Sequence, residues 1–234
     1  MSEPTDLDLI TLHTIALFNH DASGRITGSN EPIPAKAPRL YVGRSPEGNV
    51  WRFEEAVPDD VAARLDHVLR AEPPATDLEA PPRCRQQVTD LLASHAQVTT
   101  VSSGPAWLVP SNTPLSDGIA TTSALSADQI KDADQLFASD LAPLLPYAAV
   151  VVNGAVASLC SCSRITPDVA EAGLVTVEEH RGHGYAAAAT AAWAAAVRAT
   201  GRLPLYSTSW DNRASRRVAA KLGLRLYGAD YSMT

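Results

Sequence analysis

The spacing of hydrophobic and polar positions predicts alternating strands and helices after residue 147. Two apolar runs flank Asn153-Gly154, a pair that supplies both positive-φ residues of a type I′ turn, so residues 147–163 read as a β-hairpin. A third strand is expected at residues 171–177. It is followed by an alanine-rich helix, a strand, a short helix and a last strand, at residues 186–200, 203–210, 211–223 and 224–233. The order β-β-β-α-β-α-β is typical of a mixed α/β sheet.

Before residue 147 the same spacing predicts three helices and three β-rich stretches. The helices are expected at residues 58–72, 83–95 and 126–141. A strand is expected at residues 9–20, which are rich in Leu, Ile and Thr, and hairpins are expected at residues 39–53 and 97–110. Residues 73–82 read PPATDLEAPP and form the clearest linker. We therefore predict an N-terminal β/α segment of unknown role at residues 1–75 and a second domain at residues 83–234.

Composition places the chain among globular proteins that bury a core of useful size. The chain has 234 residues, of which 45% are hydrophobic and 19% charged. No run reaches the roughly 18 continuous apolar residues of a membrane helix, and the start MSEPTDLDLI lacks the basic region of a signal peptide. Three cysteines are an odd and sparse set. We therefore expect a reduced, cytoplasmic protein with no membrane partner.

Charge is distributed unevenly along the chain. The net charge of −7 argues against a general nucleic-acid binder. Residues 181–234 nevertheless carry eight Lys or Arg against two Asp, a net charge of +6, whereas residues 1–180 carry −13. This basic quarter is either a chance excess of solvated arginines or the binding region of a ligand with phosphate groups.

A glycine-rich turn lies directly before the alanine helix. Gly182 and Gly184 precede Ala186, although glycine costs about 1 kcal/mol relative to alanine inside a helix. The glycines therefore belong to the turn and the alanines to the helix. Unpaired backbone N–H groups and the helix dipole converge at such a helix start, which makes it a ready anion site. The third glycine of a dinucleotide fingerprint and the Gly-Lys-Ser/Thr of a P-loop are both missing.

Two motifs in a fixed order carry a resemblance to a known family. Arg181 to Ala186 fit the pattern R-x-x-G-x-A, with Thr176 five residues upstream. After the alanine helix and one strand come Asn212-Arg213-Ala214-Ser215 and then Lys221-Leu222-Gly223-Leu224. In this order the motifs resemble the GNAT superfamily of acyl-CoA N-acyltransferases, over residues 147–228. The resemblance implies a GNAT-type mixed α/β fold, which reaches back to about residue 83 and is preceded here by an additional β-plus-α segment.

The resemblance also implies a co-substrate, acetyl-CoA, and the residues that bind it. Backbone N–H groups of the glycine turn would hold the pyrophosphate. Backbone groups of the strand would bind the pantetheine amides, and one N–H near Val177 would serve as the oxyanion donor. The implied cofactor-binding residues are Val175, Val177, Arg181, Gly182, His183, Gly184, Tyr185, Ala186, Ala187, Asn212 and Ser215.

The reaction implied is direct attack of an amine on the thioester, so the amine must lose a proton. The carboxylates near the strand are Glu171, Glu178 and Glu179, and we expect Glu171 to be the general base, acting directly or through water. A solvated glutamate at the start of a strand is the alternative interpretation of Glu171. Many family members protonate the leaving thiolate with a tyrosine whose position here is Ala219. Ser215 is the substitute we name as catalytic, with Tyr206 and solvent as alternatives.

The remaining candidate residues have simpler interpretations. Cys160 and Cys162 alternate with Ser161, so both face one side of a strand and are expected in the core. The six histidines show no metal-ligand spacing, so no metal is expected. Trp193 is expected to anchor the alanine helix. Arg216 and Arg217 reach either the ribose phosphate of the cofactor or solvent.

The acceptor cannot be read from the motifs. We expect a small-molecule or peptide amine, with residues 1–75 forming one wall of its pocket, or else a stabilising flap or dimer contact. The protein is expected to be a monomer or a homodimer. Because the usual tyrosine is missing, a non-catalytic acyl-CoA-binding or regulatory module is the alternative function.

Overall fold

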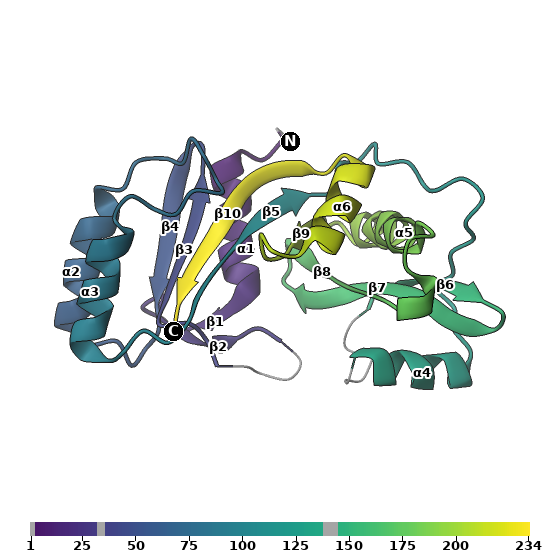
Figure 1. The fold of residues 1–234 in the computed structure, drawn as a ribbon, viewed down its shortest axis with the longest axis horizontal. Helices are drawn as coiled ribbons and strands as arrows, with labels where there is room; N and C mark the ends of the chain where they lie inside the picture. Colours follow the sequence, from purple (N-terminus) through teal and green to yellow (C-terminus); the bar gives the residue numbers. More distant parts are fainter. Residues whose placement is uncertain (1–2, 32–35, 138–144) are drawn as a thin grey trace.

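The computed structural model describes residues 3–31, 36–137 and 145–234, and its main feature is an eight-stranded mixed sheet with helices on both faces (Figure 1). The strand order is β4-β3-β10-β5-β9-β8-β7-β6, and a separate two-stranded sheet pairs β1 with β2. The strands are β1 Phe18–His20, β2 Ile26–Ser29, β3 Leu40–Ser45, β4 Gly48–Phe53, β5 Val101–Leu108, β6 Ala148–Val152, β7 Ala155–Ile165, β8 Val169–Thr176, β9 Leu203–Ser207 and β10 Arg225–Met233. The helices are α1 Asp6–Leu17, α2 Asp59–Arg70, α3 Arg85–His95, α4 Ala127–Phe137, η2 Glu178–His180, α5 Tyr185–Ala199 and α6 Arg213–Leu222. The predicted mixed α/β class is confirmed.

The C-terminal part has the predicted element order. Asn153 (φ 50°) and Gly154 (φ 85°) form the turn between β6 and β7, because both positions of a type I′ turn require positive φ. The Asn212 side chain accepts a hydrogen bond from the Ser215 N–H at 3.0 Å and so caps α6. Gly223 ends α6 in the left-handed conformation. Helix α4 also lies within the predicted range, of which residues 138–141 fall outside the described residues.

The strand predicted at residues 9–20 is wrong: most of it is helix α1. Thr5 and Asp8 form a capping box that starts the helix, with each side chain accepting a hydrogen bond from the backbone N–H of the other residue. The run is apolar on nearly every side, so its periodicity could not separate a strand from a buried helix. Leu9 and Ile10 are fully buried, where α1 crosses the sheet beneath β3, β10 and β8.

The hairpin predicted at residues 97–110 is also wrong, because this segment forms the single strand β5. Gly104 and Pro105 suggested a turn, but they pair in register with Asp230 and Ala229 of β10. A Cβ at position 104 would overlap the Thr208 carbonyl oxygen. The glycine is therefore present for close backbone approach, as glycine within a strand often is.

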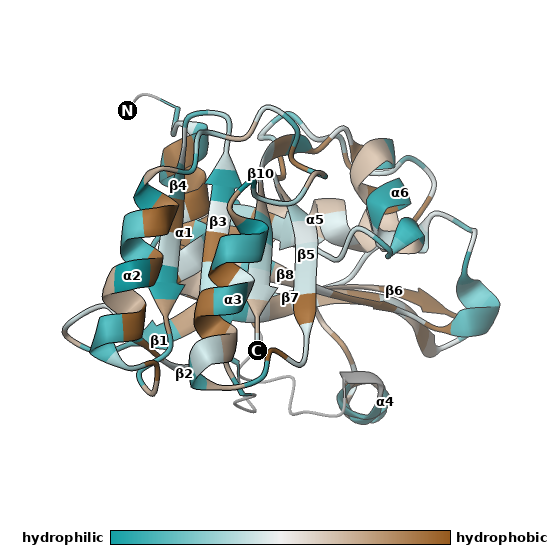
Figure 2. Ribbon diagram, turned by 60° about the vertical axis from the view of Figure 1, so that its left-hand side comes forward, coloured by the Kyte–Doolittle hydropathy of each residue, from teal (hydrophilic) through white to brown (hydrophobic). Residues whose placement is uncertain are grey.

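Residues 1–75 pack into the same sheet as the rest of the chain. Strand β3 pairs with β10, which places the last strand of the chain between an early strand and β5. Residues 73–82 form an irregular loop between α2 and α3, and the Glu72 carboxylate accepts hydrogen bonds from the N–H groups of Arg83 and Cys84. Helices α2 and α3 each mix hydrophobic and hydrophilic residues (Figure 2). Their apolar residues Leu65, Leu69 and Leu92 are buried against β3 and β10.

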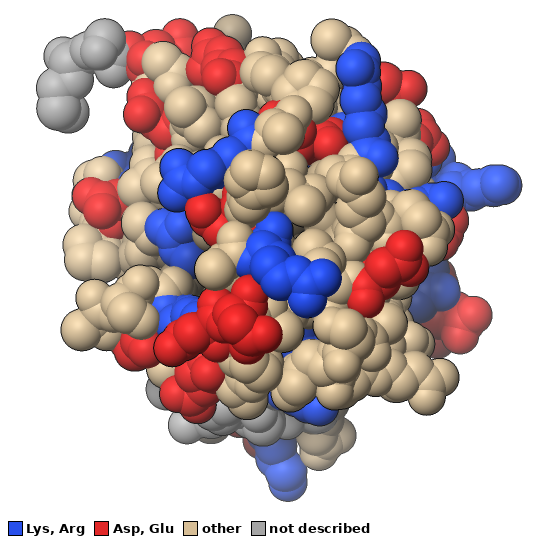
Figure 3. Space-filling view, turned by 90° about the vertical axis from the view of Figure 1, so that its left-hand side faces the viewer, with Lys and Arg blue, Asp and Glu red and all other residues tan. Residues whose placement is uncertain are grey.

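The two faces of the sheet have separate cores. Helix α1 covers one face, where its apolar residues share a core with Tyr227 of β10 and Leu205 of β9. Helix α5 covers the opposite face, where Trp193 is fully buried and donates to Cys162 Sγ at 3.4 Å. Cys160 and Cys162 face this core, as predicted. Acidic and basic side chains both occur across the face that carries α2 and α3 (Figure 3).

Candidate active site

Strands β8 and β9 separate partway along their length. They pair in parallel over Val169–Leu203, Ala170–Pro204 and Glu171–Leu205, and no further pair follows. Strand β8 continues to Thr176 paired with β7 alone, and its residues become partly exposed from Ala172 onward. Beyond these three pairs the facing edges of β8 and β9 are not hydrogen-bonded to each other, and we call this gap in the pairing the strand cleft.

The backbone of β8 presents two residues to this cleft. The Val177 N–H donates to the Ala157 carbonyl of β7 at 3.0 Å, and the Val175 carbonyl accepts from Ser158 Oγ at 3.1 Å. Because successive residues of a strand point their backbone groups to opposite sides, Leu174 and Thr176 direct theirs toward the strand cleft. The predicted donor at Val177 is therefore engaged with β7, and Leu174 and Thr176 offer the accessible backbone groups.

The glycine turn lies at the start of α5, beyond the end of β8. Gly182 and Gly184 have φ angles of 84° and 83°, which other residues rarely adopt. Space around Gly182 is open, since a Cβ added there would meet no heavy atom within 4 Å beyond its own chain neighbours. The first N–H groups of α5, at Tyr185, Ala186 and Ala187, have no partner within the helix. The predicted anion site is thus built as a glycine turn followed by a helix start.

Lys221, which the sequence places in a motif but does not assign to the anion site, lies at this turn. A Cβ added at Gly184 would lie 2.7 Å from Lys221 Nζ, so the ammonium group of the last turn of α6 lies over the first turn of α5. The Arg181 side chain beside it is 66% exposed. The His183 ring stacks on Tyr185, with ring centroids 5.5 Å apart. These groups place positive charge and polar rings around the turn. Lys221 could be assigned to the turn only once the packing of α6 against α5 was known.

Two hydroxyl groups meet on the α5 side of the strand cleft. Tyr206 of β9 and Ser215 of α6 lie with their side-chain oxygens 2.5 Å apart. Burial raises the pKa of Tyr206 to about 12, against the opposing hydrogen bond with Ser215. Ala219 is buried in the same cluster one helical turn after Ser215. The structure therefore brings together the two side chains predicted as substitutes for the missing tyrosine.

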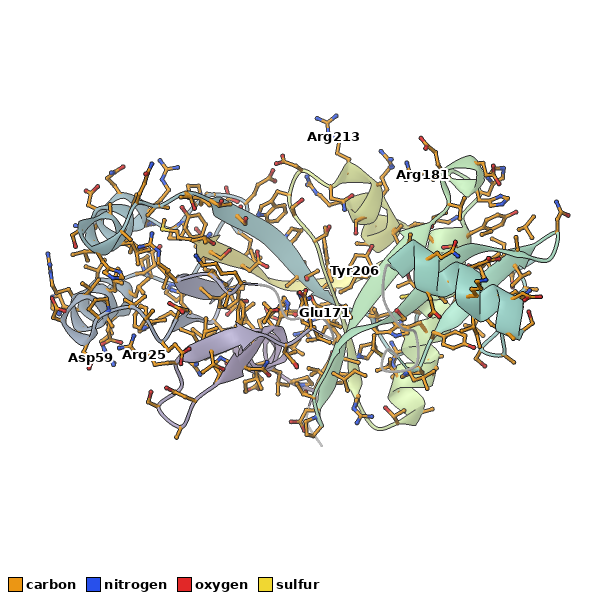
Figure 4. All side chains as sticks on the ribbon, turned by 90° about the horizontal axis from the view of Figure 1, so that it is seen from below. Arg25, Asp59, Glu171, Arg181, Tyr206 and Arg213 are labelled. Atoms are coloured by element: carbon orange, nitrogen blue, oxygen red, sulfur yellow. The ribbon has the colours of Figure 1, made fainter. Side chains whose placement is uncertain are left out.

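Glu171 lies at the base of the strand cleft, near the centre of the molecule in Figure 4. One carboxylate oxygen accepts from Ser207 Oγ and lies 3.2 Å from His13 Nε2, and the other accepts from Arg164 Nη1 at 2.7 Å. Arg164 also pairs with Glu31. Burial by itself raises the pKa of Glu171, but His13, Arg164 and the Ser207 hydrogen bond outweigh it and hold the pKa well below its usual range.

This environment argues against the predicted role of Glu171 as general base. A carboxylate whose pKa is strongly lowered binds protons weakly, and each of its oxygens already has a partner. The alternative interpretation, a solvated glutamate, does not hold either, because Glu171 is 1% exposed. Glu178 and Glu179 have side chains 90% and 78% exposed, in agreement with surface positions.

Asp230 of β10 is a second titratable group near Glu171, and it is half-buried. Burial raises its pKa to about 6, with a contribution from the charge of Glu171, while His13, the Gly104 N–H and Arg164 act in the opposite direction. The folded state therefore binds a proton more tightly than the unfolded chain does. Stability falls as pH rises from about 4 to 6, and above pH 6 the ionised carboxylate carries the full cost.

Asp230→Asn is expected to stabilise the protein above pH 6 and to have little effect at pH 4. A shift of about two pK units corresponds to about 3 kcal/mol at neutral pH, because one unit is 1.36 kcal/mol. Urea unfolding of both proteins at pH 4 and pH 7.5 measures this difference. Equal free-energy differences at the two pH values would show that Asp230 titrates normally.

Two further residues that were named as possible cofactor contacts, Asn212 and Arg216, have partners within the protein. Asn212 caps α6. Arg216 donates to the Trp210 carbonyl at 2.9 Å and stacks over the Trp210 ring, which favours neither of the two alternatives given for it. Within the described ranges, no three His, Cys, Asp or Glu side chains are grouped to hold a metal ion. No helix in the same ranges has the length and apolar character needed to cross a membrane.

Comparisons with known proteins concern mainly the C-terminal part. Residues 120–225 match the family model of the acetyltransferase (GNAT) domain. No curated protein matches the chain. Solved structures similar to it include a GNAT-family protein from Novosphingobium aromaticivorans, at 21% identity over 58% of this chain and 65% of that one, with a TM-score of 0.47. A GCN5-related N-acetyltransferase from Kribbella flavida is 19% identical over 62% of each chain, with a TM-score of 0.46. A GCN5-related N-acetyltransferase-like protein from Streptococcus suis is 15% identical over 85% of each chain, with a TM-score of 0.45. The match spans less than two thirds of the length of the first two proteins.

Proposed function

Residues 120–225 are an acetyltransferase domain of the GNAT family, and on that premise we propose that the protein transfers an acetyl group from acetyl-CoA to a primary amine. The observation that carries the proposal is the end of the β8–β9 pairing at the strand cleft, together with the glycine turn at the start of α5. We place this activity in the cytoplasm, because the three cysteines are free thiols. A small molecule or a peptide would supply the amine.

The groups at the glycine turn and along β8 suit coenzyme A in charge and in hydrogen-bonding capacity. A pyrophosphate needs several N–H donors and positive charge, and the turn supplies the first N–H groups of α5, Lys221 Nζ and Arg181. The pantetheine arm carries amide groups that pair with backbone, and Leu174 and Thr176 have backbone groups directed to the cleft. Acetyl-CoA supplies a thioester carbonyl, whose oxygen the N–H of Leu174 or Thr176 can stabilise as negative charge develops.

The proposed reaction needs a proton donor for the leaving thiolate. Tyr206 and Ser215 share a hydrogen bond of 2.5 Å, and Tyr206 belongs to the same core cluster as Ala219. The raised pKa of Tyr206 keeps its hydroxyl protonated at neutral pH, which is the state a donor requires. We propose that Tyr206 donates the proton and that Ser215 positions it. In Figure 4 Tyr206 lies between Glu171 and the side that carries Arg181 and Arg213.

A thiol-release assay tests the function. The protein is mixed with acetyl-CoA and a panel of amines, amino acids, aminoglycosides and peptides, and free thiol is measured together with the mass of each amine. Release of thiol with an equal amount of acetylated amine supports the proposal. Tight binding of acetyl-CoA with no turnover on the whole panel would support the non-catalytic module instead.

Tyr206→Phe is expected to lower kcat about 10²-fold and to leave the affinity for acetyl-CoA unchanged, because general acid catalysis contributes about 10²–10⁴-fold. The variant removes one oxygen and keeps the ring that packs on Trp107. Steady-state kinetics and calorimetry measure the two quantities. An unchanged kcat would transfer the proton-donor role to solvent.

A further inference from the structure

Ser207 connects the two sides of the strand cleft at its base. It belongs to β9, two residues beyond the last β8–β9 pair, and its side chain donates to Glu171 of β8. Leu203 and Leu205 of β9 belong to the core under α1, so Ser207, at the same strand phase, also faces α1. Glu171 is 1% exposed whereas Ser207 is half-buried, so Ser207 is the accessible member of the pair.

The hydrogen bond to Glu171 decides whether Ser207 can donate or accept a further hydrogen bond. A serine hydroxyl has one proton and two acceptor lone pairs. Glu171 is an anion that can only accept, so it takes this single proton. The lone pairs of Ser207 Oγ remain for another partner, which must be a hydrogen-bond donor. An amine or ammonium N–H is such a donor, and an ether, ester or carboxylate oxygen is not.

The charges around Ser207 are held by the N-terminal part of the chain. His13 of α1 contacts Glu171, and Glu31 pairs with Arg164, which pairs with Glu171. His13 is fully buried, and its Nδ1 has no hydrogen-bond partner among the residues that the structure describes. Removing the side chain of His13 or Arg164 would free Glu171 to turn away from Ser207. Two residues of the N-terminal part, His13 and Glu31, thus belong to the network that holds Ser207.

We propose that Ser207 binds the acceptor amine through its hydroxyl lone pairs, and that the Glu171–His13–Arg164 network fixes the orientation of that hydroxyl. This inference rests on the proposed function. It requires the acceptor to present a hydrogen-bond donor, such as an amine N–H, to Ser207 Oγ. It also assigns residues of α1 and Glu31 a positioning role in the acceptor pocket.

The experiment compares Ser207→Ala with Ser207→Thr, which keeps the hydroxyl group on a residue suited to strands. The amine is the best acceptor found in the panel. The Ala variant is expected to raise the acceptor KM and the acceptor Kd about tenfold or more, because a hydrogen bond to a charged group is worth about 1.5–3 kcal/mol. Acceptor Kd is measured by calorimetry with free coenzyme A present, so that no reaction occurs. The Thr variant is expected to restore both values, with the affinity for coenzyme A equal in all proteins.

Ser94→Ala on the exposed part of α3 is the matched control and should change neither constant. If Ser207→Ala does not fold, Ser207→Cys carries the same comparison, since a thiol is a weak acceptor of similar size. Unchanged acceptor constants in the Ala or Cys variant would overturn the role of Ser207. A wild-type protein that binds coenzyme A but acetylates no amine would instead overturn the proposed function, and the acceptor role with it.

Discussion

Gly182→Asp is expected to weaken acetyl-CoA binding about a hundredfold relative to Gly182→Asn. Both side chains must adopt the same positive φ of 84°, and both enter the same open space, so backbone strain is matched. The two variants differ in one negative charge beside the proposed pyrophosphate site. Two like charges about 5 Å apart repel by about 3 kcal/mol at an effective dielectric constant of about 20, which is about two powers of ten in affinity.

Calorimetric titration with acetyl-CoA measures both affinities under low and high salt. The gap between the two variants should narrow at high ionic strength, because exposed charges are screened. Equal affinity of the Asp and Asn variants at low salt would mean that the phosphates of the ligand do not lie at this turn.

Glu171→Ala is expected to lower the free energy of unfolding by about 3–5 kcal/mol at pH 7. The substitution leaves His13 buried without its carboxylate partner and removes the more buried of the two carboxylates that pair with Arg164, and breaking a buried pair has a cost of this size. Urea unfolding at pH 7 measures the loss. Glu31→Gln is the matched control, because it removes the more exposed carboxylate of the same Arg164 and should cost about 1 kcal/mol or less.

The same residue predicts the direction of the pH dependence. The pKa of Glu171 is lower in the folded protein than in the unfolded chain, so its stabilisation is complete above the ordinary glutamate pKa. The stabilisation is lost as pH falls from that value toward the lowered pKa. The difference in stability between wild type and Glu171→Ala should therefore shrink on acidification below about pH 4.5. A difference that stays constant between pH 7 and pH 3 would contradict the lowered pKa.

Sequence reasoning succeeded where the signal was local. The Asn153-Gly154 turn and the Gly182 turn each follow from backbone conformations that few residues adopt, so a short stretch was sufficient to predict them. The order of elements after residue 147 followed from the same short-range signals.

It failed where the determining contact is distant in sequence. Helix α1 is apolar on most sides because it is covered on most sides, and no period within residues 9–20 reveals that covering. Gly104 and Pro105 resemble a turn until the Thr208 backbone is placed against them. The buried partners of Glu171 could not be predicted either, because His13 lies 158 positions away in the chain. The Leu174 and Thr176 backbone groups could be chosen over those of Val175 and Val177 only once the pairing of β8 with β7 was known.

Hydrogen–deuterium exchange with and without acetyl-CoA tests the central claim most directly, because it reports on individual backbone N–H groups. The proposed binding mode predicts slower exchange in the presence of acetyl-CoA at residues 182–187 and at Leu174 and Thr176, with little change at Val177, whose N–H is already bonded to Ala157. Peptides from α2 and α3 should exchange at the same rate in both states. Protection confined to other segments, or no protection at saturating acetyl-CoA, would contradict the claim that the strand cleft and the glycine turn bind the acetyl donor.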